Sequence, residues 1–389
     1  MKILLTCEDY LPHIGGAEIC VLNLRKELRA LGHSVSVVTN TTPLTSDEDG
    51  IIRTAWSFTP WGIWRNVRAL WREIGRHDLV HCQYSFRLAA IAGVLARIRR
   101  KPMLLTQQGK GIVPEAGTKF FHDLLISLCK QVSMKSAAFL TSTSDEITDL
   151  TAAYVPRSRI TLISNGYDAD LFQPNPSLPI PPEFSSLPAS TKKILSVRRL
   201  VPKNGIHIFI QALALLRERR TDFHYFAIGE GRVESYIRQL IDKHGLRENV
   251  TLLGKRGNDT LASYYQHADL VVIPSSAEAR SIACIEAMGM QKPIIASRVG
   301  GLIDLLGKES TYGELVRIYE SEACTYGPPD TLSPAELEPL VLALEAFLEN
   351  PAPLRAKATL ARTLVQREYS WKAITQHYVA IYESLLLHR

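Results

Sequence analysis

The sequence predicts an α/β protein of two Rossmann-like, doubly wound domains that face each other across a cleft. The chain has 389 residues, roughly two to three typical domain lengths, and 46% of them are hydrophobic, which suffices for two cores. Short apolar, β-branched runs alternate with longer amphipathic stretches from the first residue, as parallel βαβ units require. A proline-rich stretch divides this alternation into two series of similar size.

The first series predicts a domain over residues 1–173. Its buried parallel strands are expected at residues 2–7, 34–39, 78–81, 103–106, 137–141 and 160–163. Its helices are expected at residues 17–31, 63–75, 88–100 and 121–135. Six prolines then fall between Pro174 and Pro188, a density that neither a helix nor a central strand accommodates. Residues 174–190 are therefore expected to form an extended linker.

The second series predicts a domain over residues 191–370. Its strands are expected at residues 193–197, 223–228, 250–253, 270–273 and 293–296. Its helices are expected at residues 206–219, 233–244, 261–266, 282–290 and 336–348, and one more amphipathic helix covers 371–387. Ligands bind such sheets at the carboxyl ends of the strands, so the predicted site lies in the cleft.

Positive charge is concentrated in the first predicted domain. The net charge is +6, but residues 51–140 alone hold 14 Lys and Arg against four Asp and Glu. Such a region favours an anionic partner, whether a nucleic acid, a membrane surface or a phosphorylated substrate. No nucleic-acid recognition motif accompanies it, so no nucleic-acid partner is predicted.

The remaining composition predicts a cytoplasmic protein without a metal. The longest uncharged apolar run, residues 88–96, is about half of a bilayer span, and Glu8 interrupts the N-terminal apolar run too early for a signal peptide. Six cysteines are scattered singly with no C-x-x-C pair, which predicts neither a disulfide framework nor a zinc site. Two D-x-D matches, beginning at Asp47 and Asp168, lack the strand context of a metal motif. No metal or other cofactor is predicted.

Two loops carry signals for a bound phosphate. Gly15 and Gly16 lie between the first predicted strand and its helix, where backbone amides can approach a phosphate, and a plain tight turn is the alternative. Residues 198–205 follow the first strand of the second domain and carry Arg198, Arg199 and Lys203. These cations would either neutralise a pyrophosphate or form a solvated basic loop.

The strongest local signal is a pair of glutamates eight residues apart. Glu278 precedes a predicted helix N-terminus, where backbone amides can hold a carboxylate. Glu286 lies on the same side of that helix, two turns further along. This arrangement suits binding of a sugar and a ribose through their hydroxyls, and its alternative is a helix cap beside an unrelated surface glutamate.

Taken together, these motifs resemble glycosyltransferase family 4, whose retaining enzymes adopt the two-domain GT-B fold. The resemblance covers nearly the whole chain, and the motifs occur in the family order. They are the Gly15–Glu18 loop, the N-G-x-D-x-x-x-F segment at 165–172, the G-R-L-x-x-x-K-G loop at 198–205, the G-x-G at Gly229, the paired glutamates, the V-G-G loop at 299–301 and the Tyr369–Trp371 segment. The resemblance implies that the helix over residues 371–389 packs back on the first domain.

The resemblance also implies a role for each matching residue. Glu278, Arg199 and Lys203 are the expected catalytic residues, with Glu278 holding the transferred sugar and the two cations binding the donor diphosphate. Glu286 is expected to hold the ribose. The remaining expected donor-binding residues are Gly15, Gly16, Asn204, Gly229, Arg256, Arg280, Ser281 and Ile282, and Gln108 and Gly109 are expected on the sugar and acceptor side.

Three departures from the family pattern matter for the donor. Asn204 stands where the lysine is usual, Gln108 stands where many relatives carry a histidine, and residues 279–281 replace a common G-F-G. These departures bear on the identity of the donor sugar more than on the reaction. They also leave open a non-catalytic sugar-nucleotide-binding subunit, and a sugar-nucleotide epimerase on the same fold is a further alternative.

The predicted function is a retaining hexosyltransferase (EC 2.4) that uses a nucleotide sugar, with UDP favoured and GDP second. Four of the five tryptophans lie between residues 56 and 71, inside the basic region. Tryptophan and arginine there recur at helical spacings and predict contact with an anionic membrane, at Trp61, Trp64, Arg65, Arg68, Trp71 and Arg72. The expected acceptor is therefore a glycan or lipid-linked molecule of cell-surface polysaccharide or glycolipid synthesis. The expected location is the cytoplasm, either free or peripheral on the inner face of its membrane.

Overall fold

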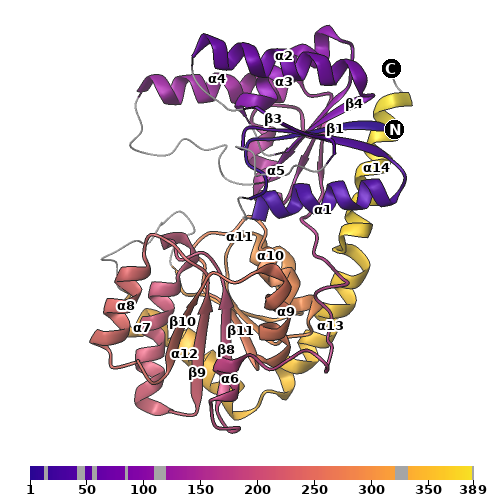
Figure 1. The fold of residues 1–389 in the computed structure, drawn as a ribbon. Helices are drawn as coiled ribbons and strands as arrows, with labels where there is room; N and C mark the ends of the chain where they lie inside the picture. Colours follow the sequence, from indigo (N-terminus) through magenta and orange to yellow (C-terminus); the bar gives the residue numbers. More distant parts are fainter. Residues whose placement is uncertain are drawn as a thin grey trace. The chain divides into compact units, whose positions relative to one another are not determined.

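The protein consists of two α/β units, each a parallel sheet covered by helices (Figure 1). The computed structural model describes residues 1–12, 16–41, 49–54, 59–83, 86–108, 120–319 and 332–387. The first unit comprises Met1–Gly166 together with Trp371–Arg389, and the second comprises Tyr167–Ser370. The predicted α/β class of two doubly wound domains is confirmed.

Within the described residues, the first unit has a seven-stranded sheet in the order β3-β2-β1-β4-β5-β6-β7, with all neighbouring strands parallel. The strands are β1 (Lys2–Cys7), β2 (Ser34–Thr39), β3 (Ile51–Arg53), β4 (Leu79–Gln83), β5 (Met103–Gln107), β6 (Phe139–Ser142) and β7 (Ile160–Leu162). The helices are α1 (Gly16–Ala30), α2 (Pro60–Arg76), α3 (Arg87–Ile98), α4 (Phe120–Ser136), α5 (Asp145–Ala152) and the 3-10 turn η2 (Arg157–Arg159). Central strands β4 and β5 are buried along their whole length, which explains their continuous apolar runs.

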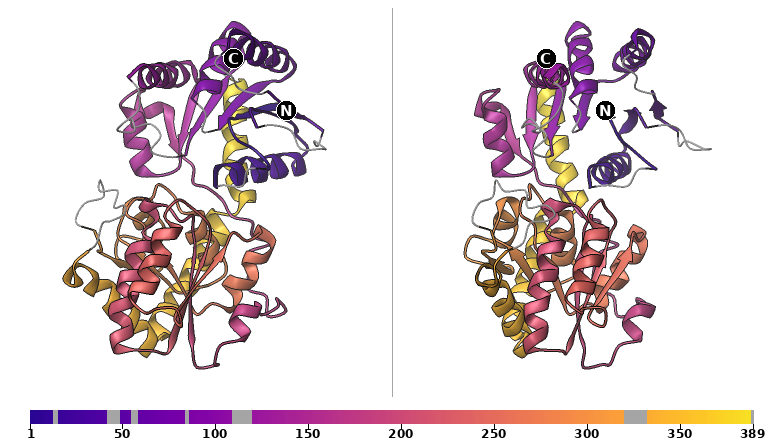
Figure 2. Two further views of the ribbon diagram at one scale, coloured as in Figure 1. Left: turned by 60° about the vertical axis from the view of Figure 1, so that its left-hand side comes forward. Right: turned by 90° about the vertical axis from the view of Figure 1, so that its left-hand side faces the viewer.

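The last helix, α14 (Trp371–Leu387), belongs to the first unit although it follows the second in sequence. It packs beside α1, and the two cover one face of the first sheet while α2, α3 and α4 form a layer on the other (Figures 1 and 2). The Tyr382 hydroxyl lies 2.5 Å from Nδ1 of His81 on β4. Gly166 admits this helix, because a Cβ there would lie 2.7 Å from the Trp371 ring.

The second unit has, among its described residues, a six-stranded parallel sheet in the order β10-β9-β8-β11-β12-β13. Its strands are β8 (Lys192–Val197), β9 (Phe223–Ile228), β10 (Val250–Gly254), β11 (Leu270–Ile273), β12 (Ile294–Ser297) and β13 (Glu314–Val316). Its helices are α6 (Pro182–Ser185), η3 (Pro202–Asn204), α7 (Ile206–Arg219), α8 (Glu234–Lys243), α9 (Asn258–His267), α10 (Ile282–Gly289), α11 (Gly300–Leu306), α12 (Pro334–Glu349) and α13 (Ala352–Glu368). Helices α7, α8 and α12 pack together, and α10 packs on α11 and α13.

The start of the second unit differs from the sequence prediction in two respects. The unit begins at Tyr167, because Tyr167 and Phe172 are buried in its hydrophobic core. The proline-rich linker is not wholly extended, because it contains the single helical turn α6. That turn tolerates its prolines because Pro182 occupies the first helical position, where a backbone N–H has no partner within the helix.

Candidate active site

The candidate site lies at the carboxyl edge of the second sheet, where β8 and β11 are neighbours. From β8 the chain continues to β9 on one side, whereas β11 starts the series on the other side. The order of the strands therefore reverses between β8 and β11. Such a switch point is where open α/β sheets bind ligands, because the loops that leave the two strands diverge there.

Arg198 follows the last residue of β8 and joins the loops at this edge. Its Nη1 donates to Ser281 Oγ at 2.9 Å, and its Nη2 donates to Asn204 Oδ1 at 3.0 Å. Nη2 also forms an ion pair with the Glu278 carboxylate. The Arg198 side chain is only 8% exposed and that of Glu278 only 12%. A nearly buried guanidinium and carboxylate therefore form the centre of the candidate site.

Close backbone contacts hold the 198–205 loop against the residues that follow β11. Gly205 has a φ of 69°, and a Cβ on it would lie 1.8 Å from the Pro274 carbonyl oxygen, so only glycine fits. The Ser276 amide donates to the Lys203 carbonyl at 2.8 Å. Asn204 Nδ2 donates to the Arg199 carbonyl at 2.7 Å, which fixes the Asn204 amide beside Arg198.

Gly229, a predicted donor-binding residue, follows β9 and lies under the same loop. Its φ is 140°, and a Cβ on it would lie 1.9 Å from the Arg198 carbonyl oxygen. A glycine is therefore required at this position because the Arg198 backbone passes close to it.

Helix α10 carries the paired glutamates and begins at the site. Ser281 is its N-cap, and Ser281 Oγ accepts the Cys284 amide proton at 3.2 Å, so Ile282 is the first helical residue. Arg280 precedes the cap and is buried, with Nη1 4.0 Å from Asp304 Oδ2 and the guanidinium 5.6 Å from the Tyr369 ring centroid. Within the described residues, Nε and Nη1 of Arg280 have no hydrogen-bond partner.

Glu286 lies two turns along α10 and is buried. The Tyr265 hydroxyl of α9 donates to its Oε2 at 3.2 Å. Burial raises the pKa of Glu286 to about 8, and the Tyr265 hydrogen bond opposes that rise without cancelling it. The carboxyl is therefore mostly protonated at neutral pH and can both donate and accept hydrogen bonds.

Of three other cations predicted for the site, two belong to the same 198–205 loop and one follows β10. The side chains of Arg199 and Lys203 are exposed. Arg256 follows β10, where Nη2 donates to Glu183 Oε1 at 2.9 Å and Nε to the Tyr264 hydroxyl at 3.2 Å. The arginine that contacts Glu278 is Arg198, which the sequence grouped with Arg199 and Lys203 as a cation for a pyrophosphate but which was not among the expected catalytic residues.

In the first unit, Gln108 follows β5 and ends a buried polar network. Its Nε2 donates to Gln83 Oε1 at 2.7 Å, and Gln83 Nε2 lies 2.9 Å from His81 Nε2. Burial lowers the pKa of His81 to about 3, so the imidazole is neutral. Gln83 and His81 were not predicted, although two polar residues at alternate positions of an apolar strand were a usable signal. Gly16 is the first residue of α1, and the predicted residues Gly15 and Gly109 lie outside the described residues.

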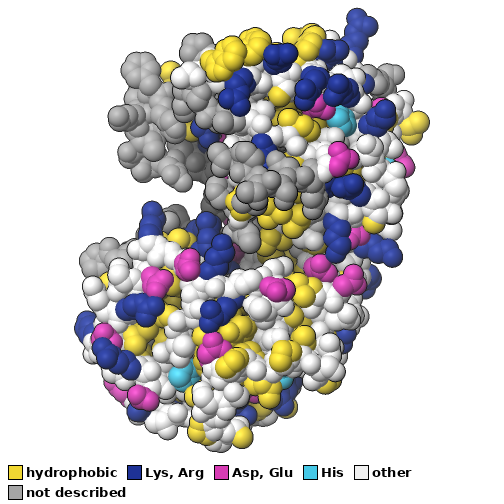
Figure 3. Space-filling view, viewed as in Figure 1, with side chains coloured by type: hydrophobic (Ala, Val, Ile, Leu, Met, Phe, Trp, Pro, Cys, Tyr) yellow, Lys and Arg dark blue, Asp and Glu magenta, His cyan; other side chains and the backbone are white. Residues whose placement is uncertain are grey.

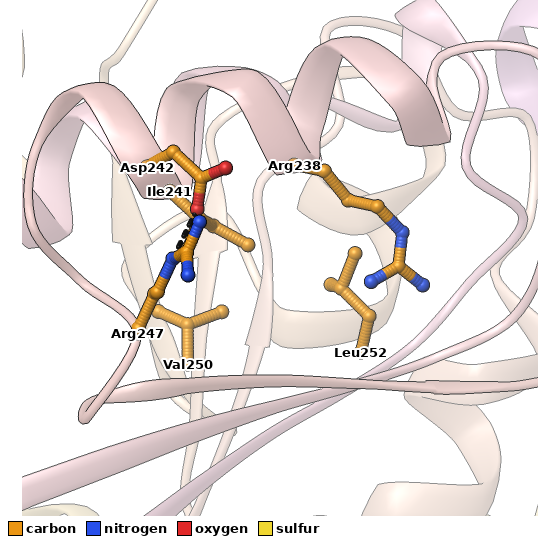
Figure 4. A pocket seen from close by; sticks show the side chains of 6 residues that line it. All are labelled: Arg238, Ile241, Asp242, Arg247, Val250 and Leu252. Atoms are coloured by element: carbon orange, nitrogen blue, oxygen red, sulfur yellow. Dashed lines mark hydrogen bonds and ion pairs between the residues drawn. The ribbon is translucent and has the colours of Figure 1, made fainter.

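A separate hollow between α8 and β10 lies on the edge strand of the second sheet (Figure 4). Arg247 Nε donates to Asp242 Oδ1 at 2.6 Å there, and Arg238 is paired with Glu234 at 2.7 Å. The hollow contains none of the predicted site residues, and its cations already have carboxylate partners. We therefore place the site at the β8–β11 edge.

The described residues show neither a cluster of metal ligands nor a membrane-spanning helix. They contain no group of three or more His, Cys, Asp and Glu placed to hold a metal ion. None of the helices described here combines the length and the hydropathy that crossing a bilayer requires.

Comparison with known proteins identifies the family. The Glycosyltransferase Family 4 model matches residues 14–171, and the Glycosyl transferases group 1 model matches residues 182–325. The chain is a glycosyltransferase of family 4. The alpha-D-kanosaminyltransferase of Streptomyces kanamyceticus is 26% identical to this glycosyltransferase over 302 residues, which are 75% of each chain. A D-inositol 3-phosphate glycosyltransferase of Corynebacterium urealyticum is 27% identical over 322 residues, covering 74% of this chain and 76% of the relative.

Solved structures show that this glycosyltransferase has the GT-B fold. Anabaena HepE in complex with UDP-glucose matches with a TM-score of 0.78 at 20% identity, over 99% of this chain and 100% of HepE. WaaG, a glycosyltransferase involved in lipopolysaccharide biosynthesis, matches with a TM-score of 0.68 at 18% identity, over 98% of this chain and 99% of WaaG.

Proposed function

We propose that this glycosyltransferase transfers a sugar, with retention of anomeric configuration, from a nucleotide sugar to a glycan or lipid-linked acceptor. The favoured donor is a UDP-sugar, with a GDP-sugar second. The observation that carries the proposal is the contact of Arg198 with Glu278 and Ser281 at the switch point, with Glu286 buried on the same helix. The HepE complex with UDP-glucose, which shares the fold, supports a nucleotide-sugar donor.

The cluster offers different chemistry to each part of a nucleotide sugar. The protonated Glu286 carboxyl suits ribose hydroxyls, because it can exchange hydrogen bonds with them in both directions. The first-turn amides of α10 after Ser281, together with the arginines, suit a diphosphate. Glu278 suits the hydroxyls of the transferred sugar. Transfer with retention then depends on stabilising the departing diphosphate, for which this chain supplies cations and amides.

Nucleotide binding and donor turnover test this proposal separately. UDP, GDP, ADP and their glucose esters would be added in a thermal-shift panel, where a ligand at about 100 times its Kd stabilises by about 2.7 kcal/mol. We expect one nucleotide series to stand out, and we expect hydrolysis of its sugar ester without any acceptor. Binding without any turnover would instead support a non-catalytic sugar-nucleotide-binding subunit. The presence of Asn204 at the usual lysine position is the feature that favours this alternative. Absence of binding to all three series contradicts the proposal.

The acceptor side of the proposal rests on the exposed face of α2, which we call the basic aromatic face. It consists of Trp61, Trp64, Arg65, Arg68, Trp71 and Arg72. Trp61 is 65% and Trp64 45% exposed, and their rings stack with centroids 4.8 Å apart. The Arg68 guanidinium lies 5.3 Å from the Trp64 ring centroid. These tryptophans are therefore surface residues, whereas Asn66, Leu70 and Ile74 are buried residues of the same helix.

The neighbouring helices extend this surface. Val94 and Ile98 of α3, and Leu124 and Leu128 of α4, are also exposed. Figure 3 shows hydrophobic and basic side chains side by side over this helix layer, at the top of the view. Tryptophan prefers the bilayer interface, and each arginine near an anionic surface contributes about 1 kcal/mol. This supports a peripheral membrane site, and with it an acceptor of cell-surface polysaccharide or glycolipid synthesis.

Liposome sedimentation tests the basic aromatic face. We expect binding that rises with anionic lipid, falls in 1 M salt, and is lost in Arg65→Glu/Arg68→Glu/Arg72→Glu. The matched control reverses three exposed cations elsewhere, in Arg29→Glu/Lys243→Glu/Lys308→Glu. Because screening at 1 M shortens the reach of charge to about 3 Å, binding that ignores salt, lipid charge and both triple variants would leave a soluble acceptor as the better interpretation.

A further inference from the structure

Two departures from the family pattern lie six residues apart in the 198–205 loop. The pattern begins with an uncharged glycine where this chain has Arg198, and it has a lysine where this chain has Asn204. One change adds a positive charge and the other removes one. Between these two positions the positive charge is therefore kept but lies at position 198 instead of position 204, and Lys203 adds a further positive charge to the loop.

The two departing residues touch each other. Arg198 Nη2 donates to Asn204 Oδ1 at 3.0 Å, and Asn204 Nδ2 is anchored on the Arg199 carbonyl at 2.7 Å. Asn204 is buried, so a lysine here would bring its ammonium towards a guanidinium in a nearly dry environment. The asparagine instead offers an oxygen that accepts a guanidinium proton. The presence of Arg198 thus accounts for the absence of a lysine.

Arg198 retains capacity to bind an anion although it already contacts Glu278. A guanidinium has five N–H donors, and the structure uses three of them, on Ser281, Asn204 and Glu278. Its Nε is buried and has no hydrogen-bond partner in the described part of the chain. A buried donor without a partner is costly unless a ligand atom completes it. Ser281 is also the N-cap of α10, so this guanidinium lies beside the positive end of that helix.

We propose that Arg198 binds the diphosphate of the nucleotide-sugar donor, in place of the lysine that the family pattern has at position 204. The inference rests on the proposed function and names the residue that neutralises its leaving group. The guanidinium holds Glu278 with Nη2 and presents its remaining N–H groups to phosphate oxygens. The carboxylate that faces the sugar and the cation that faces the diphosphate are thereby held in one contact. A lysine ammonium is a point charge and lacks this planar fork.

The test exchanges the two residues. The variants are Arg198→Gly, Asn204→Lys and the double variant Arg198→Gly/Asn204→Lys, with Arg198→Lys as a variant that keeps the charge. The control is Arg220→Ala, which removes a partly buried arginine paired with Asp222 at 2.8 Å. Isothermal titration measures the Kd of UDP, GDP and ADP for the parent. The tightest of the three, and its monophosphate, are then titrated against each variant.

We expect Arg198→Gly to raise the Kd of the nucleoside diphosphate by about 10- to 100-fold, which is the scale of a lost charge-assisted hydrogen bond. The Kd of the monophosphate should rise by less. Asn204→Lys alone should not tighten binding, because its charge repels Arg198. The double variant should return to within about threefold of the parent. Arg220→Ala should bind like the parent.

Three results would overturn the inference. They are an Arg198→Gly variant that binds the diphosphate like the parent, a double variant as weak as Arg198→Gly, and an Asn204→Lys variant that binds more tightly than the parent. Calorimetry without ligand shows whether each variant folds. If Arg198→Gly does not fold, the double variant decides, because a double variant that binds the diphosphate more than about threefold more weakly than the parent overturns the inference. A parent that binds none of the three nucleotides refutes the proposed function instead, so the two failures are distinguishable.

Discussion

Replacing Glu286 by glutamine should make the protein more stable at alkaline pH. The carboxyl is buried, and the Tyr265 hydroxyl donates a hydrogen bond to it at 3.2 Å. Glutamine has nearly the same shape, keeps an oxygen for that hydroxyl and never ionises. The substitution therefore removes the ionisation and leaves the packing.

The magnitude follows from the pKa of Glu286, which burial raises from 4.5 to about 8. Between these values the unfolded carboxyl has lost its proton while the folded one retains it. The free energy of unfolding therefore falls as pH rises, by about 1.4 kcal/mol per pH unit. From pH 5 to pH 8 the parent should lose about 4 kcal/mol that Glu286→Gln does not lose.

Other buried groups titrate with the opposite sign but cancel in the comparison. The pKa of His81 is lowered to about 3 and that of Lys292 to about 8, both by burial, so each favours stability as pH rises. Parent and variant share both groups. The difference between their stabilities therefore isolates Glu286.

Urea unfolding at pH 5, 6, 7 and 8, followed by circular dichroism, measures this difference. The control is the exposed substitution Glu218→Gln, which should differ from the parent by the same amount at every pH. We expect the free energy of unfolding of Glu286→Gln, relative to that of the parent, to rise steadily with pH. A difference that stays constant within about 1 kcal/mol from pH 5 to pH 8 would refute the reasoning, because Glu286 would then titrate alike in both states.

Four further variants test the site and the domain boundary. Glu286→Ala should reduce the binding free energy of the nucleotide by about 1–3 kcal/mol in titration calorimetry, whereas Glu278→Ala should lower donor turnover with less effect on nucleotide affinity. If both variants behave like the parent, the assignment of the two glutamates is contradicted. Gln83→Leu should cost about 1–3 kcal/mol in thermal unfolding, because Gln108 and His81 lose a buried partner, and an unchanged midpoint would show that the network is not stabilising. Phe172→Ala should cost about 3–5 kcal/mol in the unfolding of the second unit, and an effect confined to the first unit would return the boundary to residue 173.

The fold class could be predicted because both sheets are parallel and buried on both faces. Their strands then read as continuous apolar runs, which a sequence displays directly. The helix α13 was not predicted, although Leu354, Ala358, Ala361 and Val365 recur at helical spacing and are buried. Two of these four are alanines, so the periodicity of hydrophobicity is weak. The strand β3 was also not predicted. It has only three residues, all half-buried, which are too few to show an alternating pattern.

The local placement of the two glutamates could be predicted, with Glu278 in the loop before a helix and Glu286 on that helix, because an apolar run from Ile282 to Met288 surrounds Glu286. The choice between Arg198 and Arg199 could not. Both follow β8, and the one that turns inward is decided by Asn204 and by Ser281, 83 residues away in the chain. Contacts of that kind exist only after β8 and β11 are paired in the sheet, so neither local propensity nor motif spacing contains them.

Several unfavourable features of the second unit lie where a ligand would relieve them. Glu286 destabilises the fold as pH rises, and Nε of Arg198 and of Arg280 and the Ser275 hydroxyl are buried without hydrogen-bond partners in the described chain. Each such group lowers stability, and selection for stability alone would replace it. All of them belong to α10 or to the loops that leave β8 and β11. A nucleotide sugar offers the missing complements, because its phosphate oxygens accept from guanidinium groups and its ribose hydroxyls bond to a carboxyl. Under the proposed function, this cost in stability prepares the site for its donor.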